Sequence, residues 1–277
     1  MISSNRQVNR NERQRQLNTA LSVYPKFSPL SDCQIYLINQ TTSPMLIQDL
    51  IQLARETTQF TIDTECDYVT HEPALIQIEF LNINSVVLLI ETCHLPNSSS
   101  VLFWLIRSLL KIIFQPSNVI LSWGDLFFEL AAFLHYGLFS VNAIYQMNVI
   151  DVQHRFKKWY NQTFVHMCEL RPYHEDSPLC TCLYRPVKNA KNQWSLQRAI
   201  AYTFHEFLDK SQTKSHWRQR LSLIGNVHPY AMVNNKMKQT RAHLINYAAN
   251  DCLAVTKLMM VVELNWTKEQ LQRFNQL

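Results

Sequence analysis

Five short apolar runs constrain the fold of this chain more than any other feature of its sequence. Three of them follow one another closely, at residues 60–65, 74–80 and 86–90, and two more lie at 34–38 and 119–122. Runs of this length, rich in β-branched and aromatic residues and bounded by polar segments, are typical of β-strands. The sequence therefore predicts a β-sheet whose strands come mainly from the first half of the chain.

Stretches with helical periodicity separate these strands and follow them. Ser43 and Pro44 provide a cap and a proline in the first turn, which is a common way for a helix to begin. Helices are expected at residues 44–57, 99–114, 126–135, 151–160, 194–208 and 241–262. Strands that are followed by mixed strands and helices predict an α/β fold with a mixed central sheet flanked by helices.

The 277 residues fit one large domain with a tail and insertions. Residues 1–27 are polar and are expected to form a disordered N-terminal segment. The domain is expected over residues 28–265, followed by a C-terminal tail at 266–277. Two polar stretches near residues 166–193 and 222–239 interrupt the pattern and are expected to be surface insertions.

Composition excludes several classes of protein. With only three glycines the chain cannot assemble a GxGxxG or a GxxxxGK[ST] motif, so a Rossmann or P-loop nucleotide site is not expected. Seven cysteines, an odd number, argue against a secreted disulfide framework. A reducing intracellular compartment is favoured, the nucleus or the cytoplasm. The arginines of residues 1–18 leave a mitochondrial presequence as the alternative.

Charge and hydropathy indicate the kind of partner. A formal net charge of +5 suits a polyanion such as nucleic acid, although many soluble domains carry a similar charge. The longest apolar stretch, residues 101–114, contains Arg107 and Lys111 and is short for a membrane span. No contact with a membrane is expected, and the sequence identifies no protein partner.

Two acidic residues lie in the strand predicted at residues 60–65. Asp63 and Glu65 are two positions apart, so the period of a strand places both carboxylates on one face. Two like charges on an apolar strand repel each other unless a cation lies between them. The pair is therefore a candidate metal site, and solvated acids at a strand end are the alternative.

Tyr247 and Asp251 are spaced i and i+4 in the predicted C-terminal helix, which places phenol and carboxylate on one face. A tyrosine that only anchors the helix is the alternative. Asp125 follows the strand at 119–122 and begins a helix, where an acid is favourable for the helix dipole alone. Such a strand-to-helix junction also often holds active-site groups. Glu129, four residues later, competes with Asp125 for the same role.

Together these residues resemble the DEDDy-type 3′→5′ exonucleases, the tyrosine subclass of the DEDD superfamily, and among them the ribonuclease D and Werner-type exonuclease domains. The resemblance covers roughly residues 30 to 265. Its motifs are, in order, the segments 60–65 (FTIDTE), 73–78 (PALIQI), 123–125 (WGD), 149–152 (VIDV), 194–196 (WSL), 215–217 (SHW) and 247–251 (YAAND).

The resemblance implies a ribonuclease-H-like fold over residues 28–265 and a single-stranded 3′ end of RNA or DNA as substrate. It further implies that Asp63, Glu65, Asp125 and Asp251 hold two Mg²⁺ or Mn²⁺ ions and that Tyr247 orients the attacking water. Carboxylate oxygens are the ligands that such hard cations require. Phosphodiester hydrolysis would then release nucleoside 5′-monophosphates by a two-metal-ion mechanism.

Two further interpretations remain beside this one. A catalytically inactive nucleic-acid-binding or scaffold module on the same fold is the alternative function, since a fold does not settle function. The presence of every acidic position favours an active enzyme. In the first insertion, Cys168, His174, Cys180 and Cys182 could bind a structural Zn²⁺, although their spacing is not that of a zinc knuckle, and a loop that merely packs on the domain is the alternative.

Overall fold

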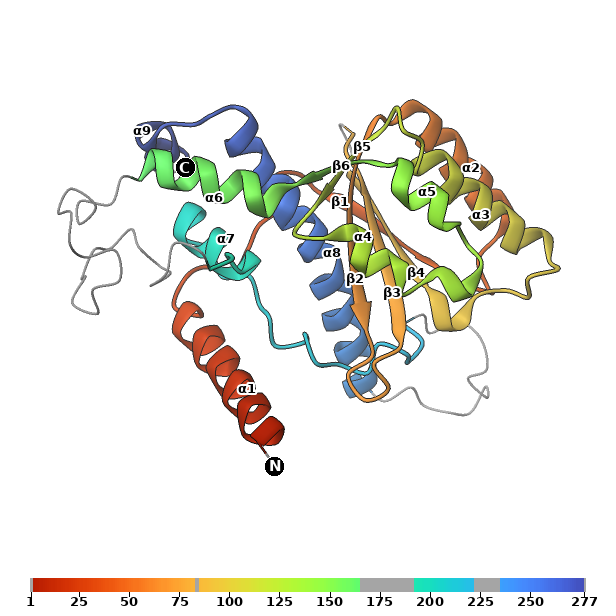
Figure 1. Ribbon diagram of the computed structural model, residues 1–277, viewed down its shortest axis with the longest axis horizontal. Helices are drawn as coiled ribbons and strands as arrows, with labels where there is room; N and C mark the ends of the chain where they lie inside the picture. Colours follow the sequence, from red (N-terminus) through yellow and green to blue (C-terminus); the bar gives the residue numbers. More distant parts are fainter. Residues whose placement is uncertain (1, 83–84, 165–191, 222–234, 277) are drawn as a thin grey trace. The chain divides into compact units, whose positions relative to one another are not determined.

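The computed structural model describes residues 2–82, 85–164, 192–221 and 235–276 (Figure 1). The chain divides into two compact units. Unit 1 consists of residues 1–28, 152–211 and 257–277, and unit 2 consists of residues 29–151 and 212–256. The expected disordered segment at residues 1–27 and the expected tail at 266–277 therefore belong to the same unit as residues 152–211.

Unit 2 contains a mixed six-stranded sheet in the order β1-β4-β3-β2-β5-β6, which confirms the predicted α/β class. β2 and β3 are antiparallel, as are β3 and β4, whereas β1–β4, β2–β5 and β5–β6 are parallel pairs. The strands are β1 (Cys33–Ile38), β2 (Gln59–Cys66), β3 (Pro73–Phe80), β4 (Ser85–Glu91), β5 (Val119–Ser122) and β6 (Asn148–Asp151).

Both faces of this sheet are covered. Every residue of β3 and β4 is buried, as expected for strands that read as continuous apolar runs. On one face α2 (Pro44–Glu56) packs with α3 (Val101–Ile113), and their apolar stripes enter the main hydrophobic core. On the other face lies the part of α8 (Asn235–Glu263) that belongs to unit 2 (Figure 1).

Between β5 and β6 the chain forms more and shorter helices than its sequence predicts. One helix was expected over 126–135, but α4 (Leu126–Ala131) ends early and a short 3-10 helix, Leu134–Tyr136, follows it. This helix ends at Gly137, whose φ of 69° lies in the left-handed region that glycine adopts without strain. The six-residue α5 (Val141–Gln146) was not predicted, because so short a helix shows little periodicity.

The long C-terminal helix begins before its predicted start. α8 already includes residues 235–239, which belong to the second expected insertion, so the end of that stretch is helical. They include Lys236, Met237 and Lys238, which are good helix formers, and their polarity was mistaken for that of a loop.

Unit 1 is largely helical and corrects the expectations for both ends of the chain. α1 (Ile2–Leu21) occupies most of the segment expected to be disordered, and α9 (Lys268–Phe274) lies in the expected tail. Residues 2–21 contain no glycine or proline, and the Asn18 side chain donates to Asp209 Oδ1 at 3.0 Å. Tertiary contacts of this kind stabilise a polar helix that composition alone describes as unstructured.

The remaining helices of unit 1 are α6 (Val152–Thr163) and α7 (Leu196–Phe204), both close to their predicted positions. Lys257 in the C-terminal part of α8 is buried and pairs with Glu206 at 2.8 Å within this unit. Among the described residues, no helix combines the length and the hydropathy that a membrane crossing requires.

Candidate metal centre

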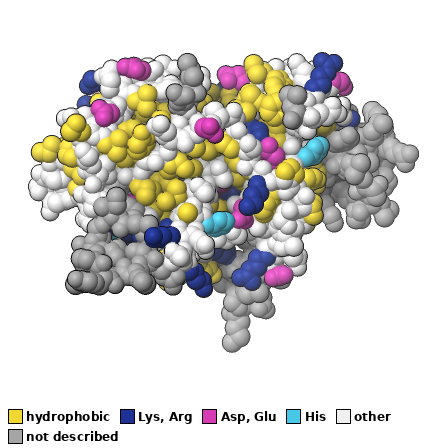
Figure 2. All heavy atoms as spheres, turned by 180° about the vertical axis from the view of Figure 1, so that it is seen from behind, with side chains coloured by type: hydrophobic (Ala, Val, Ile, Leu, Met, Phe, Trp, Pro, Cys, Tyr) yellow, Lys and Arg dark blue, Asp and Glu magenta, His cyan; other side chains and the backbone are white. Residues whose placement is uncertain are grey.

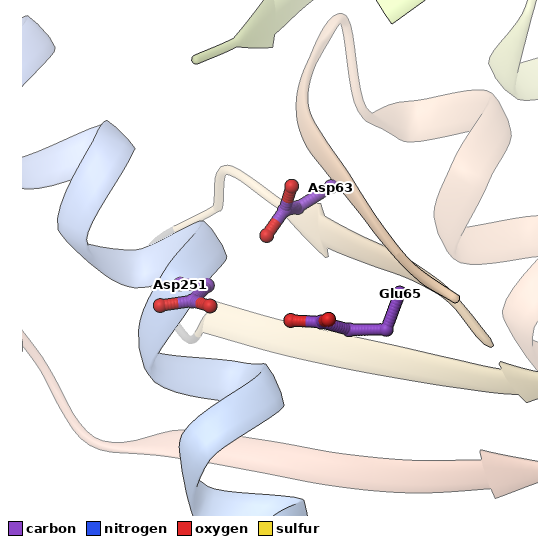
Figure 3. A group of neighbouring side chains, drawn as sticks. All are labelled: Asp63, Glu65 and Asp251. Carbon is purple, nitrogen blue, oxygen red and sulfur yellow. The ribbon is translucent and has the colours of Figure 1, made fainter. Parts of the chain in front are cut away.

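Three carboxylates converge in unit 2. Asp63 and Glu65 extend from the same face of β2, as their spacing predicts, and Asp251 lies on the facing side of α8 (Figure 3). One carboxylate oxygen from each residue lies within 4.8 Å of the other two. Two rigid elements that lie far apart in sequence thus place three acids around one point.

This arrangement fits a hard divalent cation. Asp251 is only 1% exposed, and Asp63 and Glu65 are partly buried, so their mutual repulsion is poorly screened by water. The donors are oxygen atoms alone, the set that Mg²⁺ and Mn²⁺ prefer over softer metals. Asp63, Glu65 and Asp251 are therefore the residues that would hold such an ion.

A neighbouring amide connects the two elements that carry these acids. Gln77 on β3 is fully buried and lies opposite Asp63 in the strand register. With its amide oriented to donate, the side-chain nitrogen lies 3.0 Å from the Ala248 carbonyl oxygen and 3.3 Å from Asp63 Oδ2. The hydrogen-bond network selects this orientation. Gln77 lies in the segment 73–78 (PALIQI), and no pattern in the sequence indicates its contact with Asp63.

Tyr247 lies one helical turn before Asp251, as its spacing predicts, and is 5% exposed. Burial raises the pKa of its phenol well above 10, and the negative charges of Asp251 and Glu65 raise it further. The phenol therefore keeps its proton at neutral pH and can act there by hydrogen bonding rather than as a base.

Two residues that sequence analysis did not select contact Tyr247. The Thr213 hydroxyl lies 3.0 Å from the Tyr247 hydroxyl, and the buried Trp217 ring packs beside the phenol with centroids 5.7 Å apart. Trp217 was noted only as part of a resemblance, and Thr213 gave no signal because it lies 34 positions from its partner in sequence.

Asp125 does not join the carboxylate cluster. Its side chain caps α4, with Oδ1 accepting a hydrogen bond from the Phe128 backbone N–H at 3.1 Å. The residue is exposed. The structure thus shows the capping role that any acid can take at this position, and the role of Asp125 as a fourth metal ligand stays a prediction.

Glu129 is the acid of α4 that faces β2. Its Oε2 accepts a hydrogen bond of 3.4 Å from the hydroxyl of Thr64, the residue between Asp63 and Glu65. Burial and the charge of Asp63 raise the pKa of Glu129 to about 8, and the Thr64 hydroxyl opposes this increase. Glu129 therefore lies near the cluster, and its role as a competing ligand in place of Asp125 stays a prediction.

The four residues proposed to bind structural zinc, Cys168, His174, Cys180 and Cys182, lie outside the described residues. The cysteines that the structure describes, Cys33, Cys66, Cys93 and Cys252, are all free thiols.

Comparison with known proteins places the fold. No family model matches the sequence, and no curated protein matches it. The EXO domain of Nibbler from Aedes aegypti has a TM-score of 0.54 at 15% identity, over 90% of this chain and 98% of that one. Ribonuclease D from Trypanosoma brucei has a TM-score of 0.50 at 10% identity, over 86% of this chain and 66% of that one. At these identities the likeness shows the fold alone, which is a ribonuclease-H-like α/β fold with a mixed central sheet.

Proposed function

We propose that this chain is a metal-dependent 3′→5′ exonuclease that hydrolyses phosphodiester bonds of RNA or DNA and releases nucleoside 5′-monophosphates. The observation that carries the proposal is the convergence of Asp63, Glu65 and Asp251 beside the buried phenol of Tyr247. Acids held this close on rigid elements cost folding free energy, which a bound cation would offset. The ribonuclease-H-like fold agrees with this reading.

The chain's own groups divide the work. Asp63, Glu65 and Asp251 provide the anionic oxygens, and Gln77 steadies Asp63 through its amide. Divalent ions at this site would supply charge to activate a water and to stabilise the oxygens of an in-line displacement at phosphorus. Tyr247, which stays protonated, would hold the attacking water by a hydrogen bond.

Nucleic acid is the proposed partner because the reaction needs a phosphodiester and the chain carries a net charge of +5. On the face shown in Figure 2, Lys and Arg side chains of the described residues form several separate groups, with Asp and Glu among them. A single-stranded 3′ end is the proposed form of the substrate.

A catalytically inactive nucleic-acid-binding module is the second candidate. The position of Asp125 favours an inactive module. Its carboxylate caps α4 by accepting from the Phe128 backbone N–H and does not join the other three acids, so the fourth ligand position is not filled. The presence of the other three acids in one cluster argues against it, since a binding module gains nothing from buried mutual repulsion.

Labelled oligonucleotides separate the two candidates. Purified protein with Mg²⁺ or Mn²⁺ should shorten 5′-labelled RNA or DNA to a ladder, release labelled mononucleotide from 3′-labelled substrate, and stop when EDTA is added. The matched control is Asp251→Asn, which retains the size of a buried side chain and removes one charge. Binding without cleavage by the wild-type protein would support the inactive module, and cleavage that persists in EDTA would contradict a metal mechanism.

A further inference from the structure

Residues 212–221 form a segment next to the candidate site. Its backbone is hydrogen-bonded to the turn between β2 and β3 and to the last residue of β4. The Tyr68 backbone N–H donates to the Ser215 carbonyl oxygen at 3.1 Å, and the Arg218 backbone N–H donates to Asp67 Oδ2 at 3.2 Å. At its far end the Leu221 backbone N–H donates to Glu91 Oε1, a buried carboxylate, at 2.5 Å. These bonds anchor the backbone of the 212–221 segment at three points.

Asp67 is the central anchor of this segment. Burial alone would raise the pKa of its carboxyl, but the backbone N–H groups of Thr70, Arg218 and Val69 outweigh burial and lower the pKa. Asp67 is therefore ionised at neutral pH and holds Arg218 by a charge-assisted bond. The Arg218 side chain also forms a salt bridge with Glu72. A segment held in this way can fix the position of a side chain that it carries.

The side chain so positioned is Thr213. Its hydroxyl lies 3.0 Å from the Tyr247 hydroxyl, and either oxygen could be the donor. Four residues later, Trp217 is 2% exposed and packs against the same phenol ring. One segment thus contacts both the ring and the hydroxyl of Tyr247, and Thr213 itself is an exposed residue.

The direction of the Thr213–Tyr247 bond matters for the proposed reaction. An attacking water directs a lone pair at phosphorus, so toward its neighbours it is a hydrogen-bond donor, and Tyr247 must accept from it. The phenol proton then needs another acceptor. If a carboxylate oxygen accepted the phenol proton, that oxygen would be less available to coordinate a cation. The Thr213 hydroxyl oxygen carries no charge and is not a proposed metal ligand, so it can accept the proton without this cost.

We infer that Thr213 is a positioning residue, whose hydroxyl oxygen accepts the phenol proton of Tyr247 and so directs the phenol oxygen toward the attacking water. The inference rests on the proposed exonuclease function, which gives Tyr247 its task. The raised pKa of the phenol agrees with it, because the proton stays on Tyr247. In this role Thr213 acts through Tyr247.

Three variants test the inference by single-turnover cleavage at saturating Mn²⁺. Thr213→Val keeps the shape of the side chain and removes the acceptor, so the rate should fall roughly 3- to 10-fold, the value of one net hydrogen bond. Thr213→Ser restores a hydroxyl and should return the rate to near that of wild type. In a Tyr247→Phe background, Thr213→Val should have no further effect, because there is no phenol proton left to accept.

A second measurement is independent of activity. In metal-free protein with ¹³C-labelled tyrosine, the Cζ resonance that disappears in Tyr247→Phe should shift in Thr213→Val and remain near its wild-type position in Thr213→Ser. Because Thr213 is exposed, the melting temperatures of Thr213→Val and Thr213→Ser should agree closely with that of the wild-type protein.

The outcomes separate the inference from the function on which it rests. A wild-type rate for Thr213→Val, or an equal loss in the Tyr247→Phe background, would overturn the inference while leaving the exonuclease proposal intact. Absence of cleavage by the wild-type protein under all metal conditions would instead overturn the exonuclease proposal, and the role of Thr213 with it.

Discussion

Two acidic regions of unit 2 differ although both lie near the same sheet. On β2 and α8, side chains project from within regular, rigid elements, and three carboxylates converge within 4.8 Å. At the start of α4, Asp125 lies at a helix terminus whose backbone N–H groups need acceptors, and its carboxylate satisfies one of them. The position of an acid within its element thus decides whether its charge is directed to a shared site or used locally.

Magnitudes indicate which use prevails when a cation binds. A capping hydrogen bond contributes about 1 kcal/mol to stability. Binding of a structural Zn²⁺ by its set of ligands contributes roughly 10 kcal/mol or more, which corresponds to several kcal/mol for each ligand. If Asp125 can reach the ion by a change of rotamer, coordination outweighs capping. The two regions would then differ only in the metal-free state.

Asp63→Asn should have the largest effect. The substitution retains size and removes a charge from the centre of the cluster, so cleavage should fall about 10³-fold or more, equivalent to about 4 kcal/mol. Calorimetry should show weaker Mn²⁺ binding, and metal-free stability should not decrease because a repulsion is lost. Asp49→Asn, an exposed acid on α2, is the control. Full activity of Asp63→Asn would remove β2 from the site.

Asp125→Asn and Glu129→Gln test which acid of α4 provides the fourth carboxylate. Asparagine caps a helix about as well as aspartate, so Asp125→Asn removes the charge and keeps α4 intact. We expect a roughly 10²-fold loss of single-turnover rate for Asp125→Asn and less than about 10-fold for Glu129→Gln. The reverse order would assign the fourth carboxylate to Glu129, which already faces β2 through Thr64.

Tyr247→Phe should have a smaller effect on rate than the loss of a ligand. The buried phenol has a pKa raised well above 10, so in the proposed reaction its hydroxyl would orient water and would not accept a proton. We expect a single-turnover rate about 10- to 100-fold below wild type with unchanged Mn²⁺ affinity. Tyr145→Phe, at an exposed position of α5, is the control. If Tyr247→Phe cleaves at the wild-type rate, the tyrosine only anchors the helix.

Glu129→Gln should produce the smallest effect, on stability in the absence of metal. The pKa of Glu129 is raised from 4.5 to about 8, so between these values the folded protein binds more protons than the unfolded chain. Stability contributed by the protonated group is therefore lost as pH rises through 8. The melting temperature of the variant relative to wild type should rise between pH 5 and 9. Glu56→Gln, an exposed acid of α2, should show no such trend.

The sequence predicted much of this protein because several of its signals are local. The strands at β2, β3 and β4 follow from continuous apolar runs, and the pairs Asp63–Glu65 and Tyr247–Asp251 follow from the periods of a strand and of a helix. Such periods hold wherever the element lies in the fold. Signals of the same kind were available for α9, whose Thr267 and Gln270 form a capping box, and were overlooked.

Tertiary structure alone decided the remaining features, since each depends on residues far apart in sequence. The helix α1 is stabilised by a hydrogen bond from Asn18 to Asp209. The backbone of the 212–221 segment donates hydrogen bonds to Asp67 and Glu91. The choice between Asp125 and Glu129 belongs here as well, because helix capping and orientation toward β2 are set by packing. Local periodicity thus determined which residues share a face, and only the packing of those faces determined which groups meet.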